Sequence, residues 1–293
     1  SFIFGAMFGD VGQGLILFLG GLFLYKTKHM DLAGIISCAG VFSVFFGFMY
    51  GSFFGFEDVL KAIWLKPMNQ MMDVPLVGRL NAVFVIAIGF GMFIILICMI
   101  FNIINSIRNK DTEKAWFDSN AVAGLVFYGS IVLTVGLFIS GKKLPATAVL
   151  VVMFGVPLLL MFLKEPLTNL VEKKSKIFPE QKGMFFVQSF FELFEVLLSY
   201  LSNTLSFLRI GAFAVSHAAM MEVVLMLAGA TNGGSPNWIV VVLGNIFVCA
   251  MEGLIVGIQV LRLEYYEIFS RFYAGNGREF QPFMKTLRKS VQK

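Results

Sequence analysis

The sequence predicts an all-α, polytopic membrane protein with about seven spans, and three observations support this prediction. First, 58% of the 293 residues are hydrophobic and 14% are charged, whereas soluble domains carry about a quarter charged residues. Second, the mean hydropathy is +0.82. Third, the apolar residues form continuous runs and not the alternating ten-residue segments of a membrane β-barrel.

The apolar runs divide the chain into its predicted helices. A bilayer core of about 30 Å needs about 20 apolar residues in a helix. Seven stretches meet this requirement: residues 2–25, 33–56, 80–105, 119–140, 145–163, 184–230 and 237–270. The sixth, with 47 residues, would extend about 70 Å as one helix. We therefore expect it to be strongly tilted, or to begin on the membrane surface.

Lysine and arginine in short loops predict the orientation, because they collect on the cytoplasmic side. The tail from Arg271 onward holds six basic residues and one acid, and segment 164–183 holds five lysines. Residues 231–236 carry no charge. A single crossing by 184–230 then places the C-terminus in the cytoplasm and 231–236 outside. Lys142 and Lys143 would lie outside, against the rule.

The composition argues against several other classes. The three cysteines, Cys38, Cys98 and Cys249, lie far apart in apolar runs, which favours small buried thiols over disulfides or metal ligands. With two histidines and no CxxC or HExxH motif, we expect no metal and no cofactor. The pI is about 9.1, but most basic residues flank apolar runs, where they set topology. The expected partner is therefore the lipid membrane and not a nucleic acid.

A line of polar residues runs along the sixth stretch. Spacings of three and four residues place it on one helix face, and Ser216 or His217 continues it. A charge at mid-membrane costs about 2.5–3.5 kcal/mol on insertion scales, so this face must border water or polar protein groups. The line comprises Gln188, Glu192, Glu195, Ser199, Ser202, Ser206 and Arg209.

The seventh stretch carries a similar line. Asn245, Glu252 and Gln259 are seven residues apart, and Arg262 follows three residues later on the same flank. The two lines divide the chain into a peripheral helix bundle, residues 1–183, and a pair of long tilted helices, residues 184–293, that line a polar path.

Plainer roles remain open for several of these residues. The three serines of the sixth stretch can simply allow close helix packing. His217 can be an interhelical hydrogen-bonding residue. Glu252, Glu264 and Glu267 can pair with Arg262 or lie at a solvated helix end, a role that suits the last two better because Glu252 is deeper.

Arg209 is a charged residue in the middle of a long apolar stretch. Glu195 and Glu222 lie fourteen and thirteen residues away along the same helix, about 20 Å, which is out of reach. A partner must come from another helix or another subunit. Lysine can lose its proton when desolvated, whereas arginine stays positive. Arg209 therefore suits a permanent positive gate for carboxylates or mobile cations.

Four segments resemble the membrane domain of the a subunit, called subunit I in prokaryotes, of V-type and A/V-type rotary ATPases. The two most specific are "LSNTLSFLRIGAFAVSHA" (201–218) and "MEGLIVGIQVLRLEYYEIFSRFYAGNGREFQPF" (251–283). "MFGDVGQG" (7–14) and "GFMYGSFFGFE" (47–57) resemble earlier motifs, so the resemblance covers nearly the whole chain. The sequence RIGAF (209–213) and the short loops resemble those of prokaryotic members.

The resemblance implies a stator that faces a rotating ring of c (or K) subunits, each with an ion-carrying carboxylate. It also implies eight spans after a large cytoplasmic N-terminal domain that joins the peripheral stalk and other subunits. With seven spans here, we expect that domain and one span to be absent from this chain.

The resemblance also implies roles for single residues. Arg209 matches the family's essential arginine, and Arg262, with Gln259, the second basic position facing the ring. His217 and Glu252 match the outer half-channel, and Glu195 and Asp10 the cytoplasmic one. Glu222 falls toward the outer end of its helix, and Ser199 and Ser202 toward the cytoplasmic end. Gln13 stands where eukaryotic members have histidine.

Two other classes remain as alternatives. A self-contained secondary cation transporter or channel would enclose its charges, whereas a stator would expose Arg209 toward a partner. A membrane-embedded enzyme is less suited, because the chain offers no nucleophile and base pair and no GxxxxGK[ST] motif. We expect no catalysis by this chain alone, and the transported ion, H⁺ or Na⁺, is not determined by its sequence.

Overall fold

The structure is a computed structural model that describes residues 1–56, 59–68, 71–74, 78–109, 115–142, 145–171, 182–230, 236–273 and 275. Apart from turns, the described chain is helical, with one antiparallel hairpin of β1 (Met71–Val74) and β2 (Gly78–Asn81) and one isolated bridge between Phe53 and Phe56. The predicted all-α membrane fold is confirmed.

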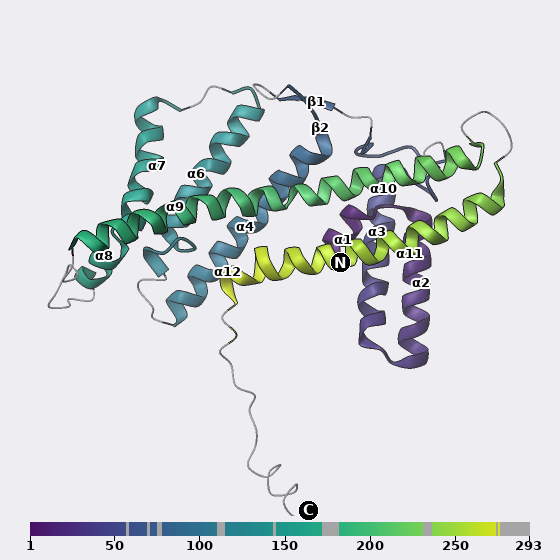
Figure 1. The fold of residues 1–293 in the computed structure, drawn as a ribbon, viewed down its shortest axis with the longest axis horizontal. Helices are drawn as coiled ribbons and strands as arrows, with labels where there is room; N and C mark the ends of the chain where they lie inside the picture. Colours follow the sequence, from purple (N-terminus) through teal and green to yellow (C-terminus); the bar gives the residue numbers. More distant parts are fainter. Residues whose placement is uncertain are drawn as a thin grey trace, which may run out of the picture.

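Three helices form a group at one end of the molecule (Figure 1): α1 (Phe2–Met7), α2 (Val11–Lys28) and α3 (Asp31–Tyr50). The prediction of one helix over 2–25 is wrong, because the chain breaks between α1 and α2. Asp10 has an extended backbone there, and its side chain caps α2 by accepting the Gln13 N–H at 2.9 Å. The predicted stretch 33–56 ends early, at Gly51, whose φ of 75° leaves the helical region.

A second group contains α4 (Ala82–Arg108), α6 (Val122–Ile139), α7 (Thr147–Phe162) and α8 (Lys164–Val171). These helices agree with the predicted stretches 80–105, 119–140 and 145–163. The chain bends by 73° between α7 and α8. The α2–α3 turn, the end of α4 and α8 lie toward one side of the molecule, and the β-hairpin and the α6–α7 connection lie toward the other (Figure 1).

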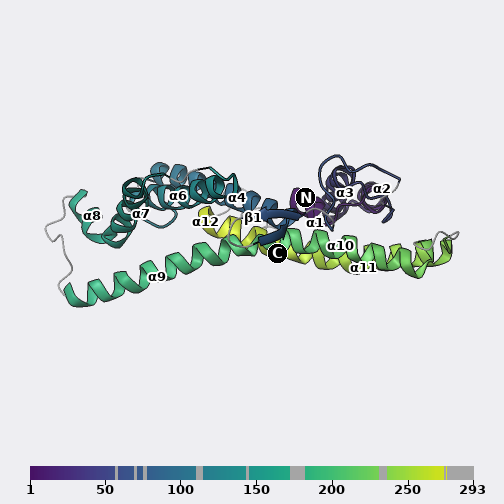
Figure 2. The same ribbon diagram turned by 90° about the horizontal axis from the view of Figure 1, so that it is seen from above.

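The last two stretches form long helices. The first is α9 (Lys182–Ser206) followed by α10 (Leu208–Leu227), and the second is α11 (Trp238–Leu263) continued by the π-helix η2 (Glu264–Phe269) and α12 (Ser270–Phe272). Both run across the steeper helices of the two groups (Figure 1), as the length of 184–230 predicted. Figure 2 shows that they form one layer, with both groups on the same side of it.

The predicted count of seven spans is not confirmed. Five helices of the described chain are long and apolar enough to cross a membrane, or six if the bent pair α7–α8 counts as one span. The difference lies largely in the first stretch. Its longer part, α2, contains Gln13 and ends on Lys26 and Lys28, and it is not among the five.

The joint between α9 and α10 is held by Phe207. Its side chain is 0% exposed, and the Phe207 N–H donates to the Thr204 carbonyl at 3.3 Å, a tighter turn than that of an α-helix. The Phe207 ring lies on Gly91 of α4, where an added Cβ would come within 2.2 Å of Cγ. Phe207 thus fixes the helix just before Arg209 against α4.

Gly91→Ala is expected to destabilise this joint, because the new methyl group overlaps the Phe207 ring. Overpacking of this kind costs about 1–3 kcal/mol, so the melting temperature of the purified chain should fall. Gly89→Ala is the matched control on the same helix, since nothing lies within 4 Å of its added Cβ. An equal melting temperature for both variants would contradict the assigned contact.

Candidate ion path

Arg209 lies in the first turn of α10, directly after the joint. The residue is partly buried, and its Nη1 is buried without a hydrogen-bond partner. Among the described residues, Arg209 forms no ion pair with an acid. The charges that act on it most are those of Arg262 and Glu267. Glu195 and Glu222 are exposed elsewhere on the long helix, so neither neutralises Arg209, as its position in the sequence predicted.

Arg262 approaches Arg209 from the neighbouring helix. It lies in the last turn of α11 and is exposed. Gln259, one turn earlier, is half-buried, and its Oε1 has no hydrogen-bond partner. The structure therefore brings the two predicted arginines together at the crossing of the long helices.

A carboxylate that the sequence placed at a solvated helix end is buried beside this pair. Glu267 is 6% exposed and accepts a hydrogen bond from the Ser206 hydroxyl, while its Oε2 has no partner. The prediction of a solvated Glu267 is therefore wrong. The physical reason is the π-helix η2, whose wider turns change the face on which later residues lie.

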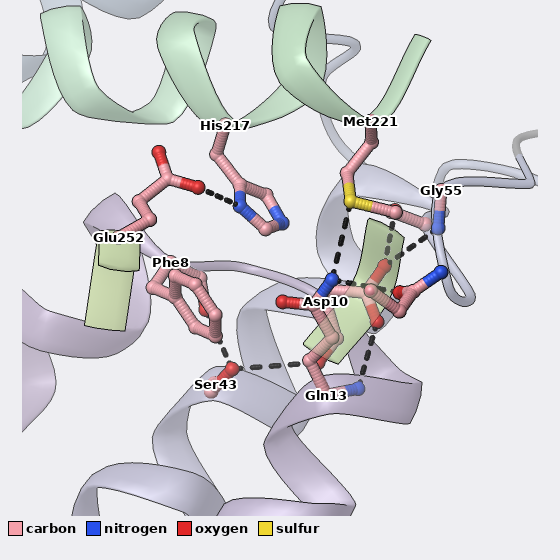
Figure 3. Close-up of polar contacts among 10 residues, drawn as sticks. Phe8, Asp10, Gln13, Ser43, Gly55, His217, Met221 and Glu252 are labelled. Atoms are coloured by element: carbon pink, nitrogen blue, oxygen red, sulfur yellow. Dashed lines mark hydrogen bonds and ion pairs between the residues drawn. The ribbon is translucent and has the colours of Figure 1, made fainter. Parts of the chain in front are cut away.

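His217 and Glu252 meet in the interior on the other side of Arg209. His217 Nδ1 and Glu252 Oε2 are 2.7 Å apart, and both side chains are buried (Figure 3). Phe8 covers the imidazole, with 4.6 Å between ring centroids. His217 Nε2 and Glu252 Oε1 have no partner. The pair thus keeps one nitrogen and one oxygen available to accept or pass on a proton, or to bind water.

An amide pair continues the polar line beyond His217. Gln13 Nε2 donates to Asn245 Oδ1 at 2.8 Å and lies 3.1 Å from the sulfur of Met221. Gln13 Oε1 is buried and has no partner. This contact joins α2, α10 and α11, so the glutamine of "MFGDVGQG" lies beside the predicted residues of the last helix (Figure 3).

The polar line on α9 is open to the surroundings. Gln188, Glu195, Ser199 and Ser202 are exposed, whereas Glu192 turns toward α8 and forms an ion pair with Lys164. The described chain covers this face at Glu192 and at Ser206, whose hydroxyl donates to Glu267.

The amino-acid sequence was compared with those of known proteins and protein families. Residues 166–285 match the V-type ATPase 116 kDa subunit family. Over 95% of its length the chain is 28% identical to the A-type ATP synthase subunit I of Aeropyrum pernix, of which it covers 45%. It is 26% identical, over 96% of its length, to the V-type ATP synthase subunit I of Borreliella burgdorferi, of which it covers 47%. Along nearly its whole length, the chain is therefore similar to subunit I of A-type and V-type ATP synthases.

Local similarity within the subunit I family is higher. A stretch of 100 residues is 42% identical to the A-type ATP synthase subunit I of Saccharolobus solfataricus, and this covers 31% of the chain and 14% of that protein. The chain spans less than half the length of these relatives. The family match over 166–285 includes Arg209, His217, Glu252 and Arg262.

Asp10, which the resemblance assigned to the cytoplasmic half-channel, is a buried carboxylate beside α2. It is 0% exposed and accepts four hydrogen bonds from its own chain: the N–H groups of Gln13, Phe54 and Gly55 and the Ser52 hydroxyl, at 2.6 to 3.1 Å. It lies beside Gln13, in the same cluster of side chains as His217 (Figure 3). The break before α2 and the turn after α3 fold onto each other, and Asp10 holds them together.

Sequence reasoning also missed a second arginine that the fold buries. Arg271, assigned to the basic tail, is 7% exposed, and it donates to Asn120 Oδ1 at 2.9 Å while Nε and Nη2 have no partner. Arg271 follows the π-helix, which no pattern in the sequence indicated. The cysteines have free thiols, but Cys38 is exposed on α3, so the expectation of burial is wrong there.

Proposed function

We propose that this chain is the membrane part of a stator subunit of a rotary A/V-type ATPase. It provides two offset half-channels for H⁺ or Na⁺ and a fixed positive charge, Arg209, between them. One observation carries the proposal: Arg209 is a partly buried guanidinium, at mid-length of an apolar helix, without an acid partner in the described chain. Such a charge calls for a partner from outside.

The layer formed by the long helices is the surface that we expect to contact a rotor ring. Both helix groups lie on one side of the layer, which leaves its other face uncovered by them (Figure 2). The long helices carry exposed apolar side chains such as Phe191, Leu198, Leu205 and Met251. The extent of this face fits a ring of membrane helices. We therefore retain the division into a supporting part, 1–183, and a ring-facing part, 184–293.

The polar groups supply the two half-channels. His217, Glu252 and Asn245, with Glu222 nearer the helix end, form the outer path, and Glu195, Ser199, Ser202 and Ser206 form the cytoplasmic one. Asp10 serves the outer group as a structural clamp. A ring carboxylate that faces lipid prefers to be neutral, and one that approaches Arg209 prefers to be ionised. It therefore releases its ion near Arg209 and binds another from the second half-channel.

Partners and location follow from the same role. The chain acts within a complex, beside a c/K ring and the other rotary ATPase subunits, and it catalyses no bond cleavage itself. It spans the cell membrane with its C-terminus in the cytoplasm. The side of the molecule that holds Lys26, Lys28 and α8 is then cytoplasmic, in agreement with the distribution of basic residues.

Arg262→Ala is expected to reduce coupled ion transport in the assembled complex less than loss of Arg209 does. Arg262 is exposed and lies at the margin of the crossing, so a remaining Arg209 still separates the half-channels. Ion uptake by membrane vesicles, measured against ATP hydrolysis, tests this ranking. An equal or greater loss for Arg262→Ala would reverse the roles of the two arginines.

A secondary transporter is the alternative. Such a protein would move the ion in vesicles that contain this chain without a ring, whereas a stator would not. The exposed line on α9 favours the stator, because a transporter needs its path enclosed.

A further inference from the structure

A large hollow lies along one flank of α11, and its lining extends to Leu261 and Glu264. It is a groove of about 1280 Å³ between α11 and the α1–α3 group, larger than the roughly 300–1,000 Å³ of pockets for small ligands. Its walls are almost wholly apolar, with Ile35 and Ile36 of α3 on one side and Leu254 and Ile258 of α11 on the other.

The groove uses a different flank of α11 from the one that meets α10. Gly244 faces α10, since an added Cβ there would lie 2.4 Å from Val224. Gly253 and Gly257, four residues apart and therefore one above the other on the helix, line the groove. Nothing lies within 4 Å of a Cβ added to either. The floor of the groove is therefore open space within the membrane-spanning part of α11.

Positive charge marks one end of the groove. On α3 the lining begins at Leu32, one residue into the helix. The last turn of α2, just before it in the chain, carries Lys26 and Lys28, and His29 follows, all exposed. Tyr25, 45% exposed, adds an aromatic side chain of the kind found at membrane interfaces. Asp31 lies in the first turn of α3, where the helix dipole offsets part of its charge. The rim thus suits a phosphate at headgroup depth, with hydrocarbon below it.

We propose that this groove binds an anionic phospholipid of the surrounding leaflet. Its acyl chains lie against Gly253 and Gly257, and its phosphate lies at Lys26 and Lys28. The lipid packs against the flank of α11 that the protein leaves uncovered, opposite α10.

The test uses the full-length protein in its assembled complex, reconstituted in lipid nanodiscs. The probes are phosphatidylglycerol and phosphatidylcholine with the same photoreactive diazirine in the acyl chain, and mass spectrometry locates the label. Phosphatidylglycerol should label peptides of α3 and α11, in preference to phosphatidylcholine by about fivefold for each lysine. Lys26→Gln with Lys28→Gln should remove the preference and keep the site.

Gly253→Leu with Gly257→Leu should fill the groove and lower labelling by both lipids several-fold. Gly129→Leu with Gly136→Leu, on α6, is the matched control, because these glycines also have nothing within 4 Å of an added Cβ. Labelling that persists after the groove is filled would overturn the proposal, as would equal labelling of the native protein by both lipids. A Gly257→Cys variant that crosslinks to a helix of another subunit would also overturn the proposal, because a protein and not a lipid would then occupy the groove.

Discussion

Arg209→Lys is expected to abolish coupled ion transport while the complex still assembles. Lysine keeps the length and the nominal charge, but it can lose its proton in an apolar setting, whereas arginine stays positive. Placing a charge at mid-membrane costs about 2.5–3.5 kcal/mol, and this cost favours the neutral form of the lysine. Loss of a positive charge with an effect of that size should slow ion release roughly a hundredfold or more. ATP-driven ion uptake in vesicles, for both H⁺ and Na⁺, measures the effect.

Two controls separate this result from general damage. Arg108→Lys makes the same change at an exposed arginine in the last turn of α4, and it should leave transport unchanged. Co-purification of the ring subunit with Arg209→Lys checks assembly. Normal coupled transport in an assembled Arg209→Lys complex would refute the stator assignment.

Asp10→Ala is expected to prevent the chain from accumulating in folded form. The change leaves four donors without an acceptor, three N–H groups and the Ser52 hydroxyl. Each unsatisfied buried donor costs about 1–3 kcal/mol, so the total is about 4 kcal/mol or more, a large part of the usual 5–15 kcal/mol of stability. Size-exclusion chromatography of the detergent-extracted chain, with its melting temperature, measures the loss.

Asp10→Asn should give an intermediate result, since its single carbonyl oxygen can still accept from two of the four donors. Asp31→Ala, at an exposed aspartate in the first turn of α3, should behave nearly as the native chain does. If Asp10→Ala melted at the native temperature, the clamp would not hold the N-terminal group, and a role for Asp10 in ion transfer would be favoured instead.

The sequence predicted the long helices better than it predicted the breaks between helices. Continuous apolar runs of about 20 residues have one stable arrangement in a bilayer, so α3, α4, α6 and the tilted helices could be foreseen. The break at Asp10 could not, because it depends on donors from residues 52–55 that only the fold brings near. Spacing along one helix placed Glu252 on a polar flank. Its contact with His217 could not be predicted, because tertiary packing brings the two helices together.

The burial of two charged residues, Glu267 and Arg271, was harder to predict than the positions of the helices. Glu267 and Arg271 stand among charged residues near a helix end, a pattern that is usually exposed, and hydropathy gave no reason to bury them. What buries them is a local change of helical repeat, which arises where packing against α4 outweighs the preference for regular hydrogen bonds. Helix propensity, which depends only on local sequence, does not predict the outcome of such a competition.

The π-helix has a consequence for how tolerant this segment is to insertion and deletion. In a regular helix each residue advances the side chains by about 100° around the axis. A π-helical turn holds about one residue more than an α-helical turn, so removing one residue between Glu264 and Phe269 would restore regular winding and leave the residues after it close to their present faces. Adding one residue would instead rotate them by about 100° and carry Arg271 away from Asn120. The length of this short segment, more than its composition, thus sets the angular phase in which the end of the last helix meets the rest of the subunit.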